Sequence, residues 1–237
     1  MAEDQLDPSH ATRSVSGPAD TSNQARGHLS LVRHRQRHGA DRRRRHGRSG
    51  GRRSAQDVMT RMADRFEQIK QTLEAAVRQD STLVGMGTTM TLVANFRADL
   101  LVAHVGDSRA YLFRQGQLER LTRDQTIVQR LLEQGSISPE EVARHPMRHL
   151  LSGVIGTKGK PIDVELRFLG LEDRDQILVC SDGLTEMVAE AAIAATLAAA
   201  PTAESACRQL VDLANRHGGK DNVTVVVSRY QIAPVVS

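Results

Sequence analysis

Two apolar stretches separated by only three residues, Thr89–Phe96 and Leu100–Val105, constrain this chain of 237 residues more than any other feature. Both have the length of buried strands, and no apolar run in the chain approaches the ~20 residues that a membrane span needs. The residues between them, Arg97-Ala98-Asp99, are those expected of a hairpin. We therefore expect an antiparallel sheet near the centre of the fold.

Further strands and several helices are indicated on both sides of this hairpin. Apolar residues recur at steps of three and four from Met59 to Val77, which predicts an amphipathic helix of about six turns. Hairpins followed by helices, and then more hairpins, favour an α+β body. The other helices are expected over residues 127–132, from Pro139 after an N-cap at Ser138, and over 189–200 and 203–216, and the other strands over 110–114, 162–168, 176–181 and 223–230.

Charge divides the chain into a basic arm and an acidic body. The formal net charge is +4, but residues 26–53 hold eleven Arg and a single acidic residue, Asp41. Such an arm either binds nucleic acid or another acidic partner, or it is disordered without a specific partner. We favour the second alternative, because no aromatic residue lies among the arginines to stack on bases.

Composition suggests four segments and a cytoplasmic location. We expect residues 1–30 to be disordered, 31–55 to form an Arg-rich tract, 56–232 to fold, and 233–237 to be a tail. The N-terminus lacks the charged start and apolar stretch of a secretory signal. The two cysteines, Cys180 and Cys207, are too few for a disulfide framework.

Three aspartates stand at the ends or starts of apolar strands, beside residues that permit tight turns. They are Asp107 in Val105-Gly106-Asp107-Ser108, Asp182 in Cys180-Ser181-Asp182-Gly183, and Asp221 in Gly219-Lys220-Asp221-Asn222. Singly, each fits ordinary turn chemistry. Together, three carboxylates on one rim could hold Mg²⁺ or Mn²⁺, and two such ions can activate water against a phosphoester.

Five motifs occur in order along the chain from Gly85 onward. They are Gly85-Met86-Gly87-Thr88-Thr89, Ala103-His104-Val105-Gly106-Asp107-Ser108-Arg109-Ala110-Tyr111, Leu121-Thr122-Arg123-Asp124, Cys180-Ser181-Asp182-Gly183-Leu184 and Asp221-Asn222-Val223-Thr224. These motifs resemble those of one enzyme family, the metal-dependent or type 2C serine/threonine protein phosphatases in their compact bacterial form. The resemblance runs from about Gly85 to Tyr230. It implies a four-layer αββα sandwich, incomplete here at its N-terminal strands, with two antiparallel sheets and a binuclear Mn²⁺ or Mg²⁺ site.

The resemblance also implies roles for individual residues. Asp182 and Asp221 match the family's metal ligands, and Asp107 matches an aspartate that helps to hold a weaker third ion. The nucleophile in this family is a metal-bound water rather than a side chain. Leu31-Val32-Arg33-His34 matches the start of the family's first strand, which makes Arg33 a candidate to bind the substrate phosphate.

Other polar residues near these motifs receive structural interpretations. We expect Arg109 to pair with a neighbouring carboxylate and His104 to be a core histidine. A stretch before Ile155-Gly156 resembles the family's flap, where a substrate-facing role competes with a structural one. The residues expected to be structural despite their position are Ser108, Cys180 and Ser181, and the flap candidates are His145, Arg148 and His149.

One family motif is missing. A strand ending in Asp-Gly-Met-Gly-Gly should precede the long helix and supply the carboxylate that bridges the two ions, but Asp41 is followed by Arg42 to Arg45. Without the bridge, the repulsion between two divalent ions is poorly offset, so their occupancy should fall. An alternative explanation is that residues 34–54 are read out of frame, since Arg outnumbers Lys by 28 to 4, as in GC-rich coding. The other frames of the coding DNA test this.

Two functions from different classes follow. The first is a phosphatase for phosphoserine and phosphothreonine in partner proteins, among them a Ser/Thr kinase or its substrates. The alternative is a weak or inactive pseudophosphatase that binds phosphoproteins as a regulatory module. No membrane partner is expected, and the basic arm is the only indication of nucleic acid.

Overall fold

Two five-stranded sheets form the centre of the computed structural model, which describes residues 15–16, 28–33, 55–96, 99–156 and 162–232. The first, sheet A, is antiparallel throughout, and its central pairs are β10–β9 and β9–β5. Its strands in spatial order are β1 (Val15–Ser16), β10 (Thr224–Arg229), β9 (Gln176–Cys180), β5 (Arg109–Arg114) and β6 (Gln117–Arg120).

The second sheet, sheet B, contains the hairpin expected from the sequence, because β3 and β4 pair antiparallel from Met90–Val105 to Phe96–Asp99. A short strand, β7 (Ile155–Gly156), pairs with the start of β3 outside the main order. Only the β2–β3 pair is parallel among the described pairs of this sheet. The order is β2 (His28–Arg33), β3 (Gly87–Phe96), β4 (Asp99–Val105) and β8 (Glu165–Gly170).

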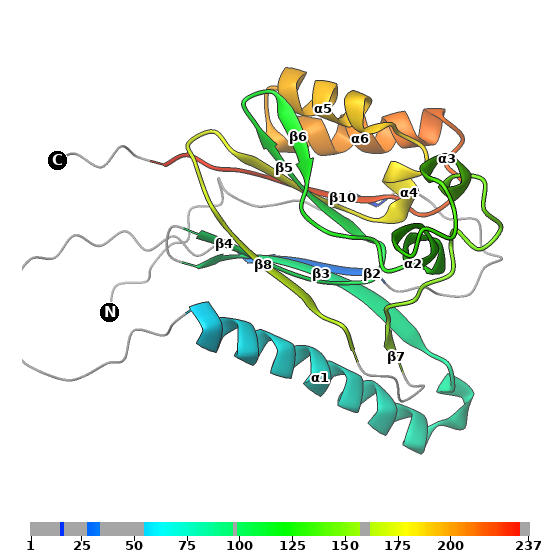
Figure 1. Cartoon of the computed structure of the whole chain (residues 1–237). Helices are drawn as coiled ribbons and strands as arrows, with labels where there is room; N and C mark the ends of the chain where they lie inside the picture. The colour runs from blue at the N-terminus through cyan, green and yellow to red at the C-terminus, as the bar shows by residue number, and fades with distance from the viewer. Residues whose placement is uncertain (1–14, 17–27, 34–54, 97–98, 157–161, 233–237) are drawn as a thin grey trace, which may run out of the picture.

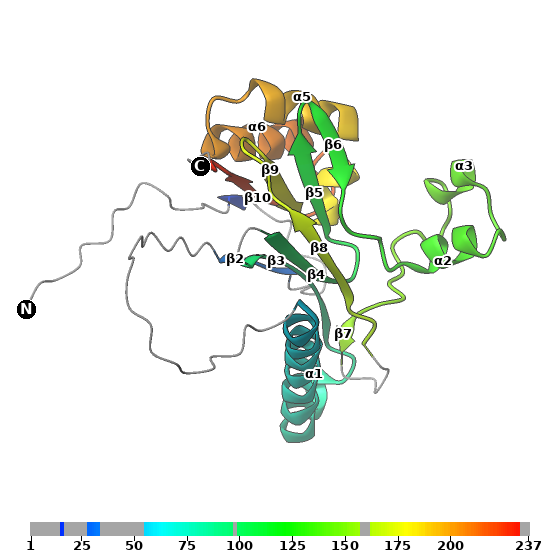
Figure 2. The same ribbon diagram turned by 60° about the vertical axis from the view of Figure 1, so that its left-hand side comes forward.

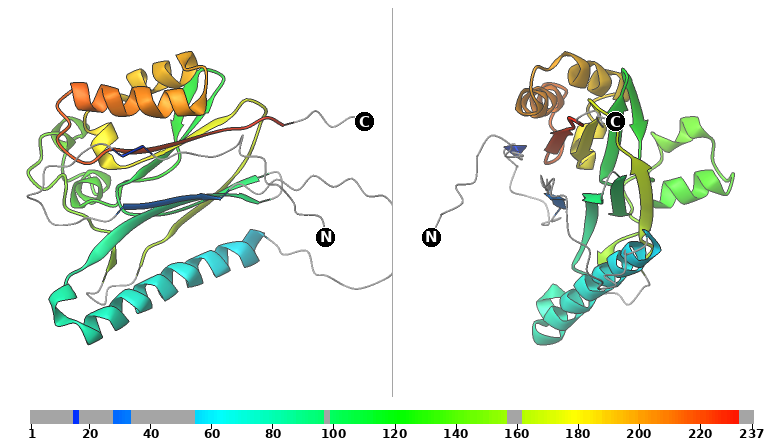
Figure 3. Two further views of the ribbon diagram at one scale, coloured as in Figure 1. Left: turned by 180° about the vertical axis from the view of Figure 1, so that it is seen from behind. Right: turned by 90° about the vertical axis from the view of Figure 1, so that its left-hand side faces the viewer.

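Helices cover the outer faces of both sheets (Figures 1 and 3). The helix α1 (Ala55–Gln79) lies along sheet B, and α5 (Glu190–Ala199) and α6 (Ala203–Arg216) lie on sheet A. The 25 residues of α1 contain neither Gly nor Pro, which favours a long helix. Asp57 in its first turn and Arg78 in its last turn carry the charges that the helix dipole favours there. The remaining short helices are η2 (Ser81–Leu83), α2 (Ile127–Glu133), α3 (Pro139–Val142) and α4 (Asp182–Thr185).

Strand alternation sorts the buried side chains into three apolar layers, as expected when successive residues point to opposite faces. In β4, Leu100 and Val102 face the other sheet, whereas Ala103 and Val105 pack with Phe66 of α1. The same alternation in β9 and β5 divides their side chains between the layer that joins the sheets and the layer under α5 and α6. Three apolar layers between four structural layers confirm the expected αββα sandwich.

The N-terminal region differs from the expectation of a disordered segment through residue 30 followed by a folded domain from residue 56. Val15–Ser16 pairs with β10 and His28–Arg33 pairs with β3, so both sheets include residues before 56. Strand β2 includes Leu31, Val32 and Arg33, where a first strand was expected to start, whereas the two residues of β1 give no strand signal in the sequence. The rest of the Arg-rich tract and the tail at 233–237 lie outside the described residues.

Of the helices in the described part of the chain, none combines the length and the apolar character required to cross a bilayer.

Candidate active site

The three aspartates singled out from the sequence lie at the same end of adjacent strands of sheet A. The last registered pair of β5 with β9 is Arg109–Cys180, so that Asp107 and Asp182 each lie two residues beyond it. Strand β10 meets β9 with Val225 opposite Cys180, and Asp221 precedes β10 at this end. The topology thus brings the three segments to one rim.

Asp107 lies in the turn that connects β4 of sheet B to β5 of sheet A. Gly106 has a φ of 119°, and a Cβ there would lie 2.3 Å from Thr89 Cγ2, so this position requires glycine. The Thr89 and Ser108 hydroxyls are 3.2 Å apart and both residues are buried. Asp107 itself is 8% exposed, and the turn therefore holds it at a fixed place between the two sheets.

Asp182 and Asp221 lie on two segments that Ser181 joins. The Ser181 hydroxyl donates to Asn222 O and accepts from Thr224 N, both at 3.0 Å. The Ser181 hydroxyl therefore acts as donor and acceptor in structural hydrogen bonds, as expected from the sequence. Asp221 is exposed, and its Oδ1 accepts a hydrogen bond from Asn222 N at 2.7 Å.

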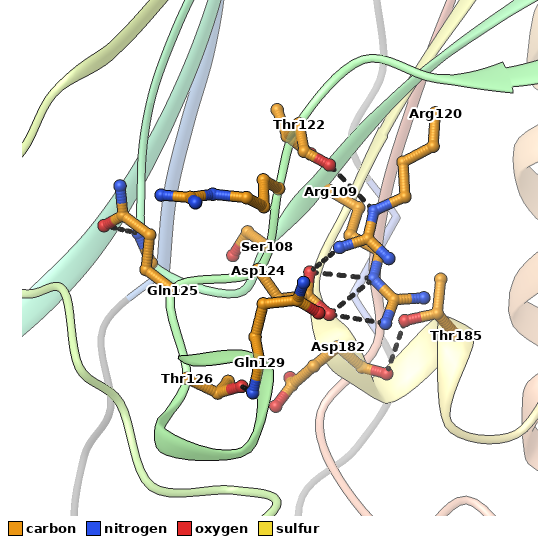
Figure 4. A network of polar contacts seen from close by, with 12 residues as sticks. Ser108, Arg109, Arg120, Thr122, Asp124, Gln125, Thr126, Gln129, Asp182 and Thr185 are labelled. Carbon is orange, nitrogen blue, oxygen red and sulfur yellow. Dashed lines mark hydrogen bonds and ion pairs between the residues drawn. The ribbon is translucent and has the colours of Figure 1, made fainter. Parts of the chain in front are cut away.

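Asp182 carries the most informative atom of the site. Its Oδ1 is buried and has no hydrogen-bond partner among the described residues. A desolvated carboxylate oxygen without a donor is unfavourable, and a cation is one way to compensate it. Figure 4 shows this side chain turned away from the guanidinium groups of Arg109 and Arg120. Its environment therefore fits a metal ligand.

The described residues do not contain a complete metal cluster. No group of three or more His, Cys, Asp or Glu side chains is placed to hold a metal ion within them. Asp41, the only acid of the Arg-rich tract, lies outside these residues. Arg33 is placed only by its backbone, opposite Ala94 in the β2–β3 pair.

Beside the aspartates, Asp124 binds two arginines (Figure 4). Arg109 donates to both of its carboxylate oxygens, the shortest distance being 2.7 Å, and Arg120 lies 2.5 Å from Asp124 Oδ1. Burial opposes the charge of Arg109, but the hydrogen bonds and charge of Asp124 outweigh it and raise the pKa. Arg109 therefore pairs with a carboxylate, as predicted, rather than facing a substrate.

His104 and Cys180 are both core residues. Nε2 of His104 lies 3.1 Å from Gly106 O and from Arg123 O, so this nitrogen carries the proton and Nδ1 accepts from the Thr91 hydroxyl. Burial lowers the pKa of His104 below its usual 6.5, which keeps the ring neutral near pH 7. Burial also raises the pKa of the fully buried Cys180 to about 12, which excludes a thiolate nucleophile.

Residues 127–150, here called the flap segment, contain α2 and α3 and project to one side of the sheets (Figure 2). Nδ1 of His145 accepts from Met147 N at 3.2 Å within its own turn. Nδ1 of His149 lies 2.8 Å from Glu186 Oε1, just after α4. Arg148 is exposed. The flap segment thus contacts the element that begins with Asp182.

Gln125 is a residue of the site that sequence reasoning missed. It is 5% exposed and bonds to three separate segments through its backbone and its side chain. It directly follows the Leu121–Asp124 motif, but a single polar residue there gives no sequence signal of this role.

Comparison with known proteins decides the family. The model of the family "Protein phosphatase 2C" matches residues 21–132. The serine/threonine phosphatase stp of Listeria innocua is 32% identical over 174 residues, which cover 73% of this chain and 69% of the relative. The chain belongs to the protein phosphatase 2C family. The family match starts before the two apolar stretches and includes the whole Arg-rich tract.

Two further comparisons extend this family assignment. The serine/threonine protein phosphatase PstP of Mycobacterium tuberculosis is 42% identical over 156 residues, which are 66% of this chain but only 30% of the relative's length. A crystal structure of the PstP catalytic domain in complex with two manganese ions has a TM-score of 0.62 and 36% identity, and the match covers 69% of this chain and 67% of that one. This chain is therefore similar to the part of a phosphatase 2C protein that binds metal.

Proposed function

We propose that this phosphatase 2C chain hydrolyses phosphoserine and phosphothreonine in protein partners and depends on Mn²⁺ or Mg²⁺. The observation that carries the proposal is the buried Asp182 Oδ1, which lacks a donor among the described residues. The similarity to a catalytic domain that binds two manganese ions supports the same assignment.

Three side chains of this chain would hold the ions. Asp182 and Asp221 lie on segments in direct contact, and Asp107 projects from the turn at the same end of sheet A. When bound, divalent cations lower the pKa of water and stabilise the charge that develops on a phosphoryl group. The protein contributes position, because the turn at Gly106 and the Ser181 hydrogen bonds fix where the carboxylates lie.

Arg33 and the flap segment are the candidates for substrate contacts. Arg33 is the sequence candidate for the phosphate, but its backbone lies opposite Ala94, which pairs with Leu101, four residues from the Val105 end of β4 that leads to Asp107, so the register does not favour this role. A partner protein carrying phosphoserine or phosphothreonine, or the kinase that makes it, would be the physiological substrate. The exposed guanidinium of Arg148 in the flap segment would pair with the negative charges of a phosphorylated peptide.

A specific observation favours the alternative, a pseudophosphatase that binds phosphoproteins without turnover. The sequence has no Asp-Gly-Met-Gly-Gly segment before the long helix, and the described residues contain no cluster of three metal-binding side chains. Loss of a bridging carboxylate leaves two cations less well neutralised. Such a chain would retain a phosphate-binding surface and lose catalysis.

Hydrolysis of a phosphothreonine peptide with and without Mn²⁺ tests the proposal. We expect Mn²⁺-dependent turnover that falls by about 100-fold or more in Asp182→Asn, since a metal site supplies several kcal/mol to the transition state. Asp212→Asn, the same change at an exposed position of α6, is the matched control and should retain activity. Peptide binding without turnover in the unaltered protein would establish the pseudophosphatase instead.

A further inference from the structure

Gln125 joins the candidate active site to the flap segment through its backbone. Its N–H donates to Gly106 O at 2.7 Å, next to Asp107. Its carbonyl accepts from Ser152 N at 2.7 Å and from Gly153 N at 3.1 Å, just after the flap segment ends. The backbone of a single residue is thus bonded through its N–H to the turn of Asp107 and through its C=O to the base of the flap segment.

The side-chain amide of Gln125 adds two further bonds. Its Oε1 accepts from Gly106 N at 3.1 Å, and its Nε2 donates to Asp163 O at 2.8 Å. The Gln125 side chain is largely shielded from solvent, since the residue is 5% exposed; the bond to Gly106 N is buried and the bond to Asp163 O is partly buried. A buried amide with both ends satisfied has one favourable orientation, so it holds its partners at fixed positions.

One glycine makes room for this amide, and a second fixes the turn to which the amide bonds. A Cβ on Gly153 would lie 1.8 Å from Gln125 Oε1, so the glutamine occupies the space that any side chain at 153 would need. Gly106 packs closely against Thr89, which a Cβ at 106 would meet at 2.3 Å. The amide is therefore packed against the Gly153 backbone while its Oε1 is hydrogen-bonded to the tightly packed turn at Gly106.

The flap segment starts and ends beside Gln125. Thr126 forms an isolated antiparallel bridge with Leu151, and Ile127 N donates to Leu150 O at 2.8 Å. The segment between them contains α2 and α3 and extends away from the sheets (Figure 2). Besides the contact of His149 with Glu186, its base is accordingly a point where its motion would reach the rest of the protein.

We propose that Gln125 is a positioning residue that locks the base of the flap segment to the Gly106–Asp107 turn, so that the flap and the Asp107 carboxylate are placed together. The lock itself follows from the contacts, whereas its effect on metal binding rests on the proposed function, in which Asp107 holds an ion. Gln125 does not contact the reacting atoms. It acts through the turn that carries Asp107.

The test compares Gln125→Met with Gln129→Met in the full chain. Methionine keeps the length of the side chain and removes both hydrogen bonds of the side-chain amide. The same change at Gln129 removes a single bond within α2, from its Nε2 to Glu133 Oε1. Hydrogen exchange of the Ser152 and Gly153 amides is the informative measurement, because their own acceptor, the backbone carbonyl of residue 125, remains in the variant.

For Gln125→Met we expect these two amides, together with Gly106, to exchange about tenfold faster or more. We also expect the Mn²⁺ concentration for half-saturation to rise about tenfold, with kcat at saturating Mn²⁺ within about twofold of the original, as for other groups that orient a metal ligand. Gln129→Met should change neither quantity. Unchanged exchange at Ser152 and Gly153, or an equal effect of Gln129→Met, would overturn the proposal.

A second variant disturbs the same hydrogen bonds by a change at the base of the flap segment instead of at Gln125. Gly153→Ala displaces the amide of an unaltered Gln125 and should reproduce the faster exchange at Gly106 and the weaker Mn²⁺ binding. The two changes should be non-additive when combined, since both release the same amide. Additive effects would show that residues 125 and 153 act separately and would contradict the lock.

Two controls keep the outcomes distinct. Should Gln125→Met not fold, Gln125→Asn, which withdraws the amide by one methylene, takes its place in the same measurements. Calorimetric titration of the unaltered chain with Mn²⁺ separates the two proposals. Absence of Mn²⁺ binding there would refute the metal-dependent function, and the exchange measurements would still decide whether Gln125 couples the flap segment to the turn.

Discussion

Gly183 lies where the segments of the two candidate metal ligands, Asp182 and Asp221, approach each other closely. A Cβ at this position would lie 2.5 Å from Asn222 O and 3.4 Å from Asp221 O. The helix α4 can therefore begin at Asp182 and still contact the Asp221 segment only because residue 183 has no side chain. Gly183 is thus a spacing residue between two candidate ligands.

Replacing Gly183 by Ala should push these segments apart. We expect Gly183→Ala to destabilise the protein by about 1–3 kcal/mol, as overpacking of buried sites does, and to weaken Mn²⁺ binding. Denaturant unfolding and Mn²⁺ titration measure the two effects. Gly170→Ala is the matched control, because a Cβ there meets nothing within 4 Å. Equal behaviour of the two variants would contradict the close approach.

The residues of the site differ in how far their sequence context reveals them. Asp107, Asp182 and Asp221 stand out because each lies beside an apolar strand, and their role as metal ligands, which stays a prediction, was implied by the family resemblance. Gln125 was not predicted, since its partners are backbone groups at positions 106, 152, 153 and 163. Every residue type can supply such backbone groups, so the sequence pattern does not indicate them. The pairing of Arg109 was predicted correctly.

At the scale of elements, an ion pair closes the sandwich at the end opposite the aspartates. Arg114, the last residue of β5, donates to both carboxylate oxygens of Asp175, at 2.8 and 2.6 Å, and Asp175 is fully buried. The same guanidinium reaches Glu172 and the carbonyl of Gly170, the last residue of β8. One side chain therefore ties sheet A to the end of a strand in sheet B.

Removal of this guanidinium should leave a buried charge without its partner. We expect Arg114→Ala to cost about 2–3 kcal/mol in the free energy of unfolding, somewhat less than a fully buried pair because Arg114 is 28% exposed. Arg208→Ala, which removes an exposed pair with Glu204 four residues away on α6, should cost about 0.5 kcal/mol or less. Chemical denaturation compares them, and similar losses would refute the closing role.

Long periodic elements were predicted well, and the short helix α3 was predicted from its N-cap, whereas β6, β7 and α4 were missed. The apolar period from Met59 to Val77 located α1, and the hairpin of β3 and β4 was correct. Strand β6 has exposed and half-buried residues only, and β7 has two residues, so neither presents an apolar run. Helix α4 has four residues, one of them Gly183, and its order comes from packing against β9 and β10.

For the whole molecule, the sandwich layers were predictable and the cation content was not. Apolar alternation determines which faces are buried, whereas metal binding depends on carboxylates brought together by tertiary contacts. The missing Asp-Gly-Met-Gly-Gly segment is a property of the sequence, and its effect on the complete site has to be measured.

Mn²⁺ should stabilise the entire fold if Asp182 holds it. A ligand present at about 100 times its Kd stabilises the native state by about 2.7 kcal/mol, which corresponds to a rise in Tm of roughly 5–10 °C for a domain of this size. Calorimetry with Mn²⁺ and then with a chelator measures the shift. In Asp182→Asn the shift should disappear, while Asp212→Asn should keep it. Identical melting of the unaltered chain under both conditions would argue against a resident cation.

The passage of the chain from β4 to β5 within residues 106–108 has a mechanical consequence. Because this short connection belongs to both sheets, sliding of one layer over the other would strain the backbone around Asp107 before it strained most other places. A cation bound by Asp107 would resist that sliding. The resistance of the two sheets to relative movement should consequently increase with the fraction of the site that is occupied by cation.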